Sequence, residues 1–266
     1  MDTTIQVFTV LILLVTLVSS TLVTQFIRRR RTLLPVRRLP AYELMPVLVG
    51  ESIERGLPIH VSLGSTGLGA NNTVLTLASA EVFYAAAQRA ATGTVAPLLT
   101  LSDTSVIPLG YGTLRRAYAA RDRLSRFRRD SIRWLPAGPR SLAFAGAVTA
   151  LLSTERVSAN ILVGSYGPEL ALILDTAYRR GQASVATSNQ LEGQAIAYAL
   201  ADRPLIGEEI FVAPAYLGDP SAASSANVFT LDVLRWLLVI AILVSTVVAV
   251  IEPVREAVEA FFFGGG

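Results

Sequence analysis

The stretch HVSLGSTGLGANN, residues His60–Asn72, joins an apolar, strand-like run to a long alanine-rich helical pattern. Three glycines, Gly64, Gly67 and Gly69, lie within six residues of each other. The loop is either a tight turn whose glycines adopt positive φ, or a cradle of backbone amides that holds a phosphate at the helix N-terminus. The spacing G-x-x-G-x-G is not the dinucleotide fingerprint G-x-G-x-x-G, so the pattern favours the turn.

The same strand-to-helix alternation continues on both sides of this loop, over residues 40–217. The predicted strands are 58–64, 95–103, 131–136, 159–164 and 183–189, with a sixth within 204–218. The predicted helices are 73–91, 109–124, 140–156, 168–180 and 191–202. Such alternation predicts an α/β domain, built on an open, mostly parallel sheet with helices on both faces.

Two long apolar runs flank this domain, at residues 5–27 and 228–251. Each is long enough to cross a hydrocarbon core of about 30 Å, so we expect two transmembrane helices. The alternatives are a cleaved signal peptide for the first run and a buried core helix for the second. The expected division of the chain is 1–27 (span), 28–39 (arginine-rich), 40–217 (α/β domain), 218–227 (linker), 228–251 (span) and 252–266 (tail).

An arginine cluster, Arg28–Arg31 with Arg37 and Arg38, directly follows the first apolar run. By the positive-inside rule, the cluster predicts an inner-membrane protein with a cytoplasmic domain and both termini outside. Membrane lipid is therefore the expected partner of the cluster. A nucleic-acid partner, the other interpretation of a basic run, is not expected.

The composition excludes several kinds of chemistry. The chain has no cysteine, no lysine and one histidine. Disulfides, thiolate catalysis, a P-loop lysine and a multi-histidine metal site are thereby excluded. No metal is predicted, and no cofactor is indicated.

Polar residues follow the predicted strands at their carboxyl ends, where ligands bind in open parallel sheets. The candidate ligand-binding residues are Ser65, Thr66, Gly67, Asp103, Ser165, Tyr166 and Glu169. Asp103 either accepts a hydrogen bond from a ribose hydroxyl, holds a metal-bound water, or caps the following helix. Glu169 either contacts a ligand or complements the dipole of its own helix.

Glu208 and Glu209 are the most distinctive acidic pair, in IGEEIF. On a strand, adjacent side chains point to opposite faces, so we expect a polar network or a subunit contact rather than a catalytic pair. We expect His60 to be a strand-surface residue, although a Ser65–His60–Asp103 triad is an alternative.

Four motifs together resemble a family of prokaryotic membrane proteins that carry a domain of unknown function. They are RRLPAYE (37–43), RGLPIHVSLGSTGLG (55–69), GSYGPEL (164–170) and LIGEEIFVAPAYLGDP (205–220). The resemblance covers about residues 37–220. It implies no activity and assigns no role to any residue.

With no catalytic constellation in view, we expect a membrane-anchored protein rather than an enzyme. Its α/β domain would act as a scaffold or small-ligand sensor, within a homo-oligomer or with other membrane proteins. One alternative is a membrane-bound enzyme that handles nucleotides or phosphoesters. Another is an accessory subunit of a larger membrane complex.

Overall fold

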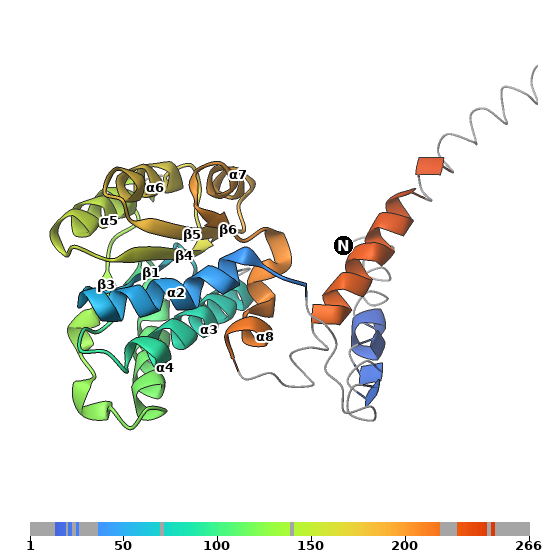
Figure 1. Cartoon of the computed structure of the whole chain (residues 1–266). Coiled ribbons are helices and arrows are strands. Elements are labelled where there is room, and N and C mark those ends of the chain that lie inside the picture. The colour runs from blue at the N-terminus through green and yellow to red at the C-terminus, as the bar shows by residue number, and fades with distance from the viewer. Residues whose placement is uncertain are drawn as a thin grey trace, which may run out of the picture. The chain divides into compact units, whose positions relative to one another are not determined.

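The computed structural model describes residues 14–19, 21–22, 25–26, 37–69, 72–138, 141–218, 228–243 and 246–247. The chain divides into two compact units. One is Arg37–Pro220, and the other combines Met1–Val36 with Ser221–Gly266. Figure 1 shows the Arg37–Pro220 unit as a sheet between two layers of helices, and the α/β fold expected from the sequence is correct for this unit.

A single six-stranded sheet forms the centre of this unit, in the order β3-β2-β1-β4-β5-β6. Every neighbouring pair of strands is parallel. Helices cover both faces, which explains why the central strands consist largely of apolar runs. The strands are β1 (His60–Gly64), β2 (Leu98–Leu101), β3 (Ile132–Trp134), β4 (Ala159–Ser165), β5 (Ala183–Ser188) and β6 (Arg203–Pro204).

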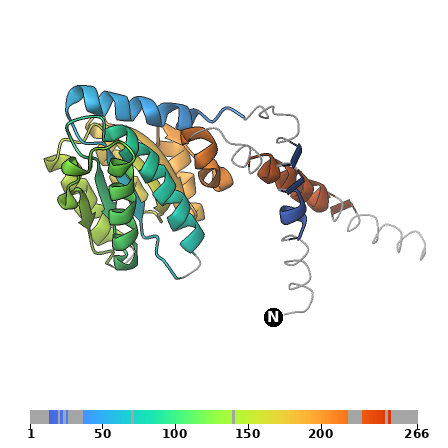
Figure 2. The ribbon, with the colours of Figure 1, turned by 90° about the horizontal axis from the view of Figure 1, so that it is seen from below.

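The helices form two layers, one on each face of the sheet (Figures 1 and 2). One layer contains α2 (Pro40–Arg55), α3 (Thr73–Ala90) and α4 (Ile107–Ala119). The other contains α5 (Leu142–Thr154), α6 (Leu170–Arg179) and α7 (Leu191–Leu200). The short helix α8 (Ala213–Leu217) packs against α2 and α3.

Helix α2 was not predicted from the sequence. Pro40 occupies its first turn, where the missing N–H removes no intrahelical hydrogen bond. Gly56 ends the helix with a φ of 64°, a left-handed conformation that glycine adopts without strain. Pro46 lies inside the helix, where proline is ordinarily unfavourable.

The predicted sixth strand was placed wrongly. Strand β6 contains only Arg203–Pro204, whereas Glu208 and Glu209 lie in a 3₁₀ helix, η5 (Gly207–Val212). The argument that the two carboxylates point to opposite faces of a strand therefore does not apply. Gly207, with a φ of 57°, turns the chain out of the extended conformation before these residues.

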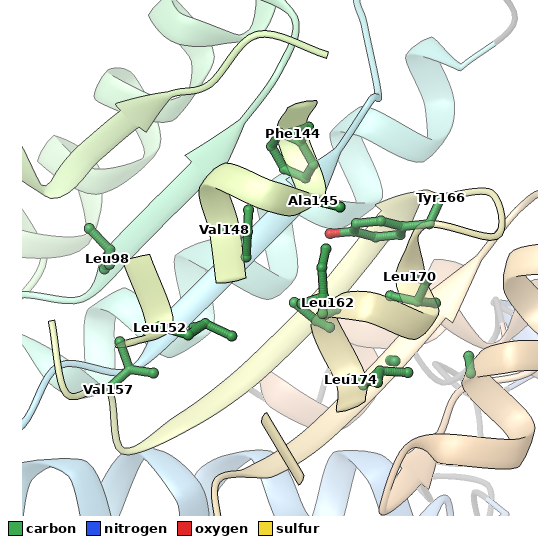
Figure 3. Close-up of a cluster of buried hydrophobic side chains, with 13 residues drawn as sticks. Leu98, Phe144, Ala145, Val148, Leu152, Val157, Leu162, Tyr166, Leu170 and Leu174 are labelled. Carbon is green, nitrogen blue, oxygen red and sulfur yellow. The ribbon is translucent and has the colours of Figure 1, made fainter. Parts of the chain in front are cut away.

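The core between the sheet and α5–α7 is a cluster of buried apolar side chains that includes Phe144, Val148, Leu162 and Tyr166 (Figure 3). The Tyr166 hydroxyl donates to the backbone oxygen of Ser62 at 2.9 Å. Because its one polar atom is bonded, a tyrosine can be buried here at little cost. The tyrosine therefore fixes the segment that follows β4 onto the sheet.

The prediction of two transmembrane helices is wrong. No helix in the described parts of the chain is both long enough and apolar enough to cross a membrane. The predicted inner-membrane localisation, with both termini outside, rested on these two helices and is wrong for the same reason.

Several sequence predictions lie outside the described residues. They concern most of the first apolar run, the end of the second, the Arg28–Arg31 cluster, the linker beyond Gly218 and the tail 252–266.

Candidate functional site

The strand order reverses between β1 and β4, because the chain builds β2 and β3 on one side of β1 and β5 and β6 on the other side of β4. In open parallel sheets, ligands bind at the carboxyl ends of the strands where the order reverses. The two loops at this place are 65–72, after β1, and Tyr166–Glu169, after β4. They contain most of the candidate residues.

Two glycines bring the ends of β1 and β4 into close contact. A Cβ on Gly164 would lie 2.0 Å from the backbone oxygen of Leu63, and a Cβ on Gly64 would lie 2.4 Å from that of Ser165. The backbone N–H of Ser65 then donates to the Ser165 oxygen at 3.0 Å. The strands therefore remain joined at the reversal point, and this contact needs glycine at both positions.

The polar side chains of the first loop bond to the protein itself. The Ser65 hydroxyl donates to the backbone oxygen of Ser165 at 2.9 Å. Thr66 is fully buried, and its hydroxyl donates to the backbone oxygen of Leu63 at 3.0 Å. Neither hydroxyl is directed at a ligand, so these contacts favour the turn interpretation of the loop over the phosphate cradle.

Gly67 lies against the carboxylate of Asp103. A Cβ at Gly67 would be 2.5 Å from Asp103 Oδ2. The other carboxylate oxygen, Oδ1, accepts from the backbone N–H of Ser105 at 2.8 Å and caps the 3₁₀ helix η1 (Thr104–Val106). In the structure, Asp103 therefore acts as a helix cap. The residue is also partly exposed beside the glycine loop.

Ser165 and Tyr166 have different surroundings. The Ser165 hydroxyl, itself buried, accepts from the side-chain amide of the exposed Gln190 at 3.0 Å. Tyr166 is completely buried, and burial raises the pKa of its phenol well above the usual value. The expectation that Tyr166 lines a ligand site is therefore corrected, because its ring packs in the core.

Glu169 lines a cavity of about 430 Å³ at the carboxyl ends of β4 and β5. The residue is only 5% exposed, and its Oε1 accepts from the backbone N–H of Gly167 at 2.9 Å. A Cβ added at Gly167 would lie 2.8 Å from Glu169 Oε2 and 3.2 Å from Gln190 Oε1. Two acceptor oxygens thus converge over a residue without a side chain. The cavity is lined by Ser141, Gly167, Pro168, Glu169, Gln190 and Glu192.

Three helices begin at this cavity. Ser141, Glu169 and Gln190 are the N-cap residues of α5, α6 and α7, and none of the three side chains caps its own helix. Partial positive charge at the helix N-termini stabilises the carboxylates of Glu169 and Glu192. Glu169 can therefore both complement the dipole of α6 and line the cavity.

The sequence analysis did not find Gln190, Glu192 or Ser141. Glutamine at the start of a helix carries no signal of its own, and these three residues come together only through the fold. Asn72 is the N-cap residue of α3, but its side chain does not cap the helix. Its side-chain oxygen instead accepts from Asn189 at 2.9 Å, which connects the loops after β1 and β5.

His60 is not on the strand surface but is fully buried within the sheet. Its Nδ1 lies 2.8 Å from Asn160 Oδ1, and its Nε2 lies 2.9 Å from the Thr100 hydroxyl. The Asn160 amide nitrogen donates to Gln182, so Asn160 Oδ1 accepts from His60 and the proton is on Nδ1. Burial lowers the pKa of His60 to about 4. The imidazole does not contact Ser65, so no triad exists.

Glu209 joins the two ends of the unit. Its Oε1 accepts from Arg37 at 2.7 Å and its Oε2 accepts from the backbone N–H of Ile206 at 2.8 Å. Glu208, its neighbour, is partly exposed. Among the described residues, no group of three or more His, Asp or Glu side chains is placed to hold a metal ion.

A family model described as a domain of unknown function (DUF6754) matches residues 2–261. The chain belongs to this family. The resemblance noted in residues 37–220 is thus confirmed, and the match extends well beyond those residues. No curated protein and no solved structure matches the chain.

Proposed function

We propose that the Arg37–Pro220 unit is a ligand-sensing domain, and that it binds a small molecule with several hydroxyl groups, such as the ribose of a nucleoside. The observation that supports this proposal is the convergence of the Glu169 carboxylate and the Gln190 side-chain oxygen over Gly167. The cavity of about 430 Å³ is in the size range of small-molecule sites.

The donors and acceptors in this cavity favour hydroxyl groups on the ligand. A carboxylate and an amide oxygen only accept hydrogen bonds, so the ligand must donate. A phosphate presents acceptors and negative charge, and Glu169 and Glu192 would repel it. A hydroxyl pair donates to both oxygens, and charge-assisted bonds to a carboxylate are stronger than neutral ones.

Sensing is favoured over catalysis because Ser65, Asp103 and His60, the side chains considered for acid–base or nucleophilic chemistry outside the Glu169 cavity, are engaged elsewhere. Ser65 bonds to Ser165, Asp103 caps η1 and His60 is enclosed in the sheet. Association with further copies of the chain or with other proteins, as the sequence analysis expects, stays a prediction.

The test is thermal unfolding of the full-length protein against nucleosides, free sugars, inorganic phosphate and nucleotides. A ligand at a hundred times its dissociation constant stabilises the fold by about 2.7 kcal/mol. We expect Gly167→Ala to abolish the shift, because the methyl group would lie 2.8 Å from Glu169 Oε2. Gly112→Ala, where the methyl group meets no atom within 4 Å, is the matched control.

Stabilisation that persists in Gly167→Ala would contradict the proposal. So would a phosphate or nucleotide response that does not depend on Glu169.

A second candidate is nucleotide handling by an enzyme, which one observation favours. Asp103 follows β2 and touches the glycine loop after β1, and the strand order is that of doubly wound nucleotide-binding sheets. Gly67→Ala separates the two candidates. It would impair nucleotide binding beside Asp103 and leave binding beside Glu169 unchanged.

A further inference from the structure

Residues 115–133, here called the arginine-rich segment, contain eight of the 23 basic residues of the chain. The segment has only two acidic residues, Asp122 and Asp130, so its formal charge is +6. The whole chain has a formal charge of +3, and the remainder is therefore net negative. The arginines are Arg115, Arg116, Arg121, Arg123, Arg126, Arg128, Arg129 and Arg133.

The arginine-rich segment runs from the second half of α4 through two 3₁₀ turns, η2 (Leu124–Arg126) and η3 (Arg129–Ser131), into β3. All eight arginines are exposed. Figure 1 shows the segment in bright green beside β3 and α4. Because the segment leads into β3, it lies towards the amino ends of the strands, whereas the Glu169 cavity lies at their carboxyl ends. The two surfaces can therefore be tested separately.

Three of the arginines have partners within the domain. Arg116 pairs with Glu81 at 2.9 Å, Arg133 pairs with Glu155 at 3.8 Å, and Arg126 donates to the backbone oxygen of Gly93 at 3.0 Å. These contacts fix both ends and the middle of the segment. The guanidinium groups of the other five form no ion pair or hydrogen bond with a described residue, so they are available to a partner. They are Arg115, Arg121, Arg123, Arg128 and Arg129.

A partly exposed aromatic residue, Phe127, lies between Arg126 and Arg128. The next residue, Arg128, lines a cavity of about 290 Å³ together with Thr94, Ser131 and Arg133, among others. Asp130 and Glu155 also line this cavity, and Arg133 pairs with Glu155. The surface thus combines a row of cations, hydroxyl groups, an aromatic ring and a recess.

We propose that the arginine-rich segment binds single-stranded nucleic acid. Arginines recur every two or three residues from Arg121 to Arg128, a stretch that has no α-helix and one 3₁₀ turn, and this linear spacing suits a linear polyanion. Guanidinium pairs with phosphate through two parallel hydrogen bonds and also stacks on bases. Aromatic rings within a basic surface are typical of proteins that bind unpaired strands.

An acidic protein segment would also form ion pairs with the arginines, but Phe127 and the recess would contribute less to its binding affinity. The expectation that the protein has no nucleic-acid partner concerned the N-terminal arginine cluster. The arginine-rich segment is a separate group of basic residues.

The test is fluorescence anisotropy of the full-length protein with a labelled single-stranded oligonucleotide of about 20 nucleotides, longer than the roughly 4–16 that one small domain covers. The triple variant Arg123→Gln, Arg128→Gln, Arg129→Gln is compared with the matched triple Arg55→Gln, Arg179→Gln, Arg203→Gln. Both remove three exposed charges from the same domain. Titrations between about 50 and 200 mM salt give the slope of log affinity against log salt.

We expect the first triple to weaken binding at least about tenfold and to reduce the salt slope by about 2, since each phosphate contact on a single strand contributes roughly 0.7. The control triple should change affinity by less than about twofold. Phe127→Leu should weaken binding of the oligonucleotide but not of inorganic polyphosphate, which has no bases to stack.

Three results would overturn the proposal. The first is no binding of the oligonucleotide, and the second is an equal loss in both triples. The third is competition by polyglutamate as strong as by the oligonucleotide at equal charge, which would assign the surface to an acidic protein. An unaffected Phe127→Leu variant would overturn the preference for single strands.

Discussion

His60 shows how a single polar residue is accommodated in the centre of a sheet. It accepts from Thr100 on β2 and donates to Asn160 on β4, so its side chain joins three neighbouring strands. Asn160 continues the chain of hydrogen bonds to Gln182. Because both ring nitrogens have partners, the neutral imidazole is stable at a fully buried site.

The first prediction concerns the pH dependence of stability. The folded pKa of His60 is about 4, below the ordinary 6.5, so the unfolded chain binds a proton that the folded chain does not. The stabilisation is complete above pH 6.5 and is lost as pH falls towards 4, by about 3 kcal/mol in all. Urea unfolding between pH 4.5 and 7.5 measures this slope.

His60→Gln is the variant for comparison, because it keeps a polar side chain but removes the titrating group. The difference between the two pH profiles isolates the contribution of His60 from that of the carboxylates, which both proteins share. Parallel profiles would contradict the prediction, because they would show that His60 binds its proton equally well in the folded and unfolded chains.

The second prediction concerns Gly164, where β4 meets β1. Gly164→Ala should destabilise the fold by about 3 kcal/mol or more, because its Cβ would lie 2.0 Å from the Leu63 oxygen and neither strand can move freely. Gly50→Ala in α2 adds a methyl group that meets no atom within 4 Å. It should stabilise by about 0.5–1 kcal/mol. Chemical unfolding of both variants tests the contrast.

At the scale of the elements, α2 and η5 depend on each other. The Tyr42 hydroxyl on α2 donates to the backbone oxygens of Glu209 and Ile210, at 2.7 and 3.3 Å. Its ring stacks on Tyr216 of α8, with the centroids 5.1 Å apart. Burial raises the pKa of Tyr42 far above its usual value, so the hydroxyl remains a donor at all physiological pH values.

The third prediction is that Tyr42→Phe costs about 1–3 kcal/mol of unfolding free energy, because it leaves buried carbonyl oxygens of η5 without their donor. Tyr178→Phe is the control, since that ring is 81% exposed, and should change stability by less than about 0.5 kcal/mol. Equal effects of the two variants would contradict the role of the Tyr42 hydroxyl. Urea unfolding at pH 7 makes the comparison.

At the scale of the molecule, Arg37–Pro220 contains a complete sheet with helices on both faces and its own core. The fourth prediction is that this unit, produced alone, unfolds in one cooperative transition. The expected heat-capacity increment is about 2 to 3 kcal/mol/K for a unit of this length. Differential scanning calorimetry measures it, and two separated transitions would contradict a single core.

The α/β class was predictable because it depends on local patterns. Apolar runs followed by alanine-rich helical stretches specify strands and helices residue by residue, and Gly64 marks the turn after β1. Local patterns did not lead to a prediction of α2, which contains an interior proline, Pro46, and packs against α3 and α8. It also extended a strand into η5, where Gly207 redirects the backbone.

The candidate site was only partly predictable, for a different reason. Sequence position indicates that Ser65, Asp103 and Glu169 follow strands, and therefore lie at the carboxyl edge of the sheet. It does not indicate how each of them is engaged, because Ser65 bonds to Ser165, a hundred residues away, while Asp103 and Glu169 accept from backbone N–H groups only two residues away. The contact of Gln190 with Ser165, and the packing of Tyr166 beside Ala145 and Leu162, are consequences of the strand order.

The chain order of residues is therefore sufficient for the α/β class, for most of its strands and helices and for the chemistry that composition excludes, because these depend on neighbouring residues or on counts. The position of β4 beside β1, the closure of the reversal point by two glycines, and the acceptor pair over Gly167 required the folded molecule. The first two arise from contacts between segments about a hundred residues apart, and the third joins Glu169 to Gln190 on the next strand-to-helix loop. Many alternative pairings are locally equivalent, and only the packing of the whole sheet selects one.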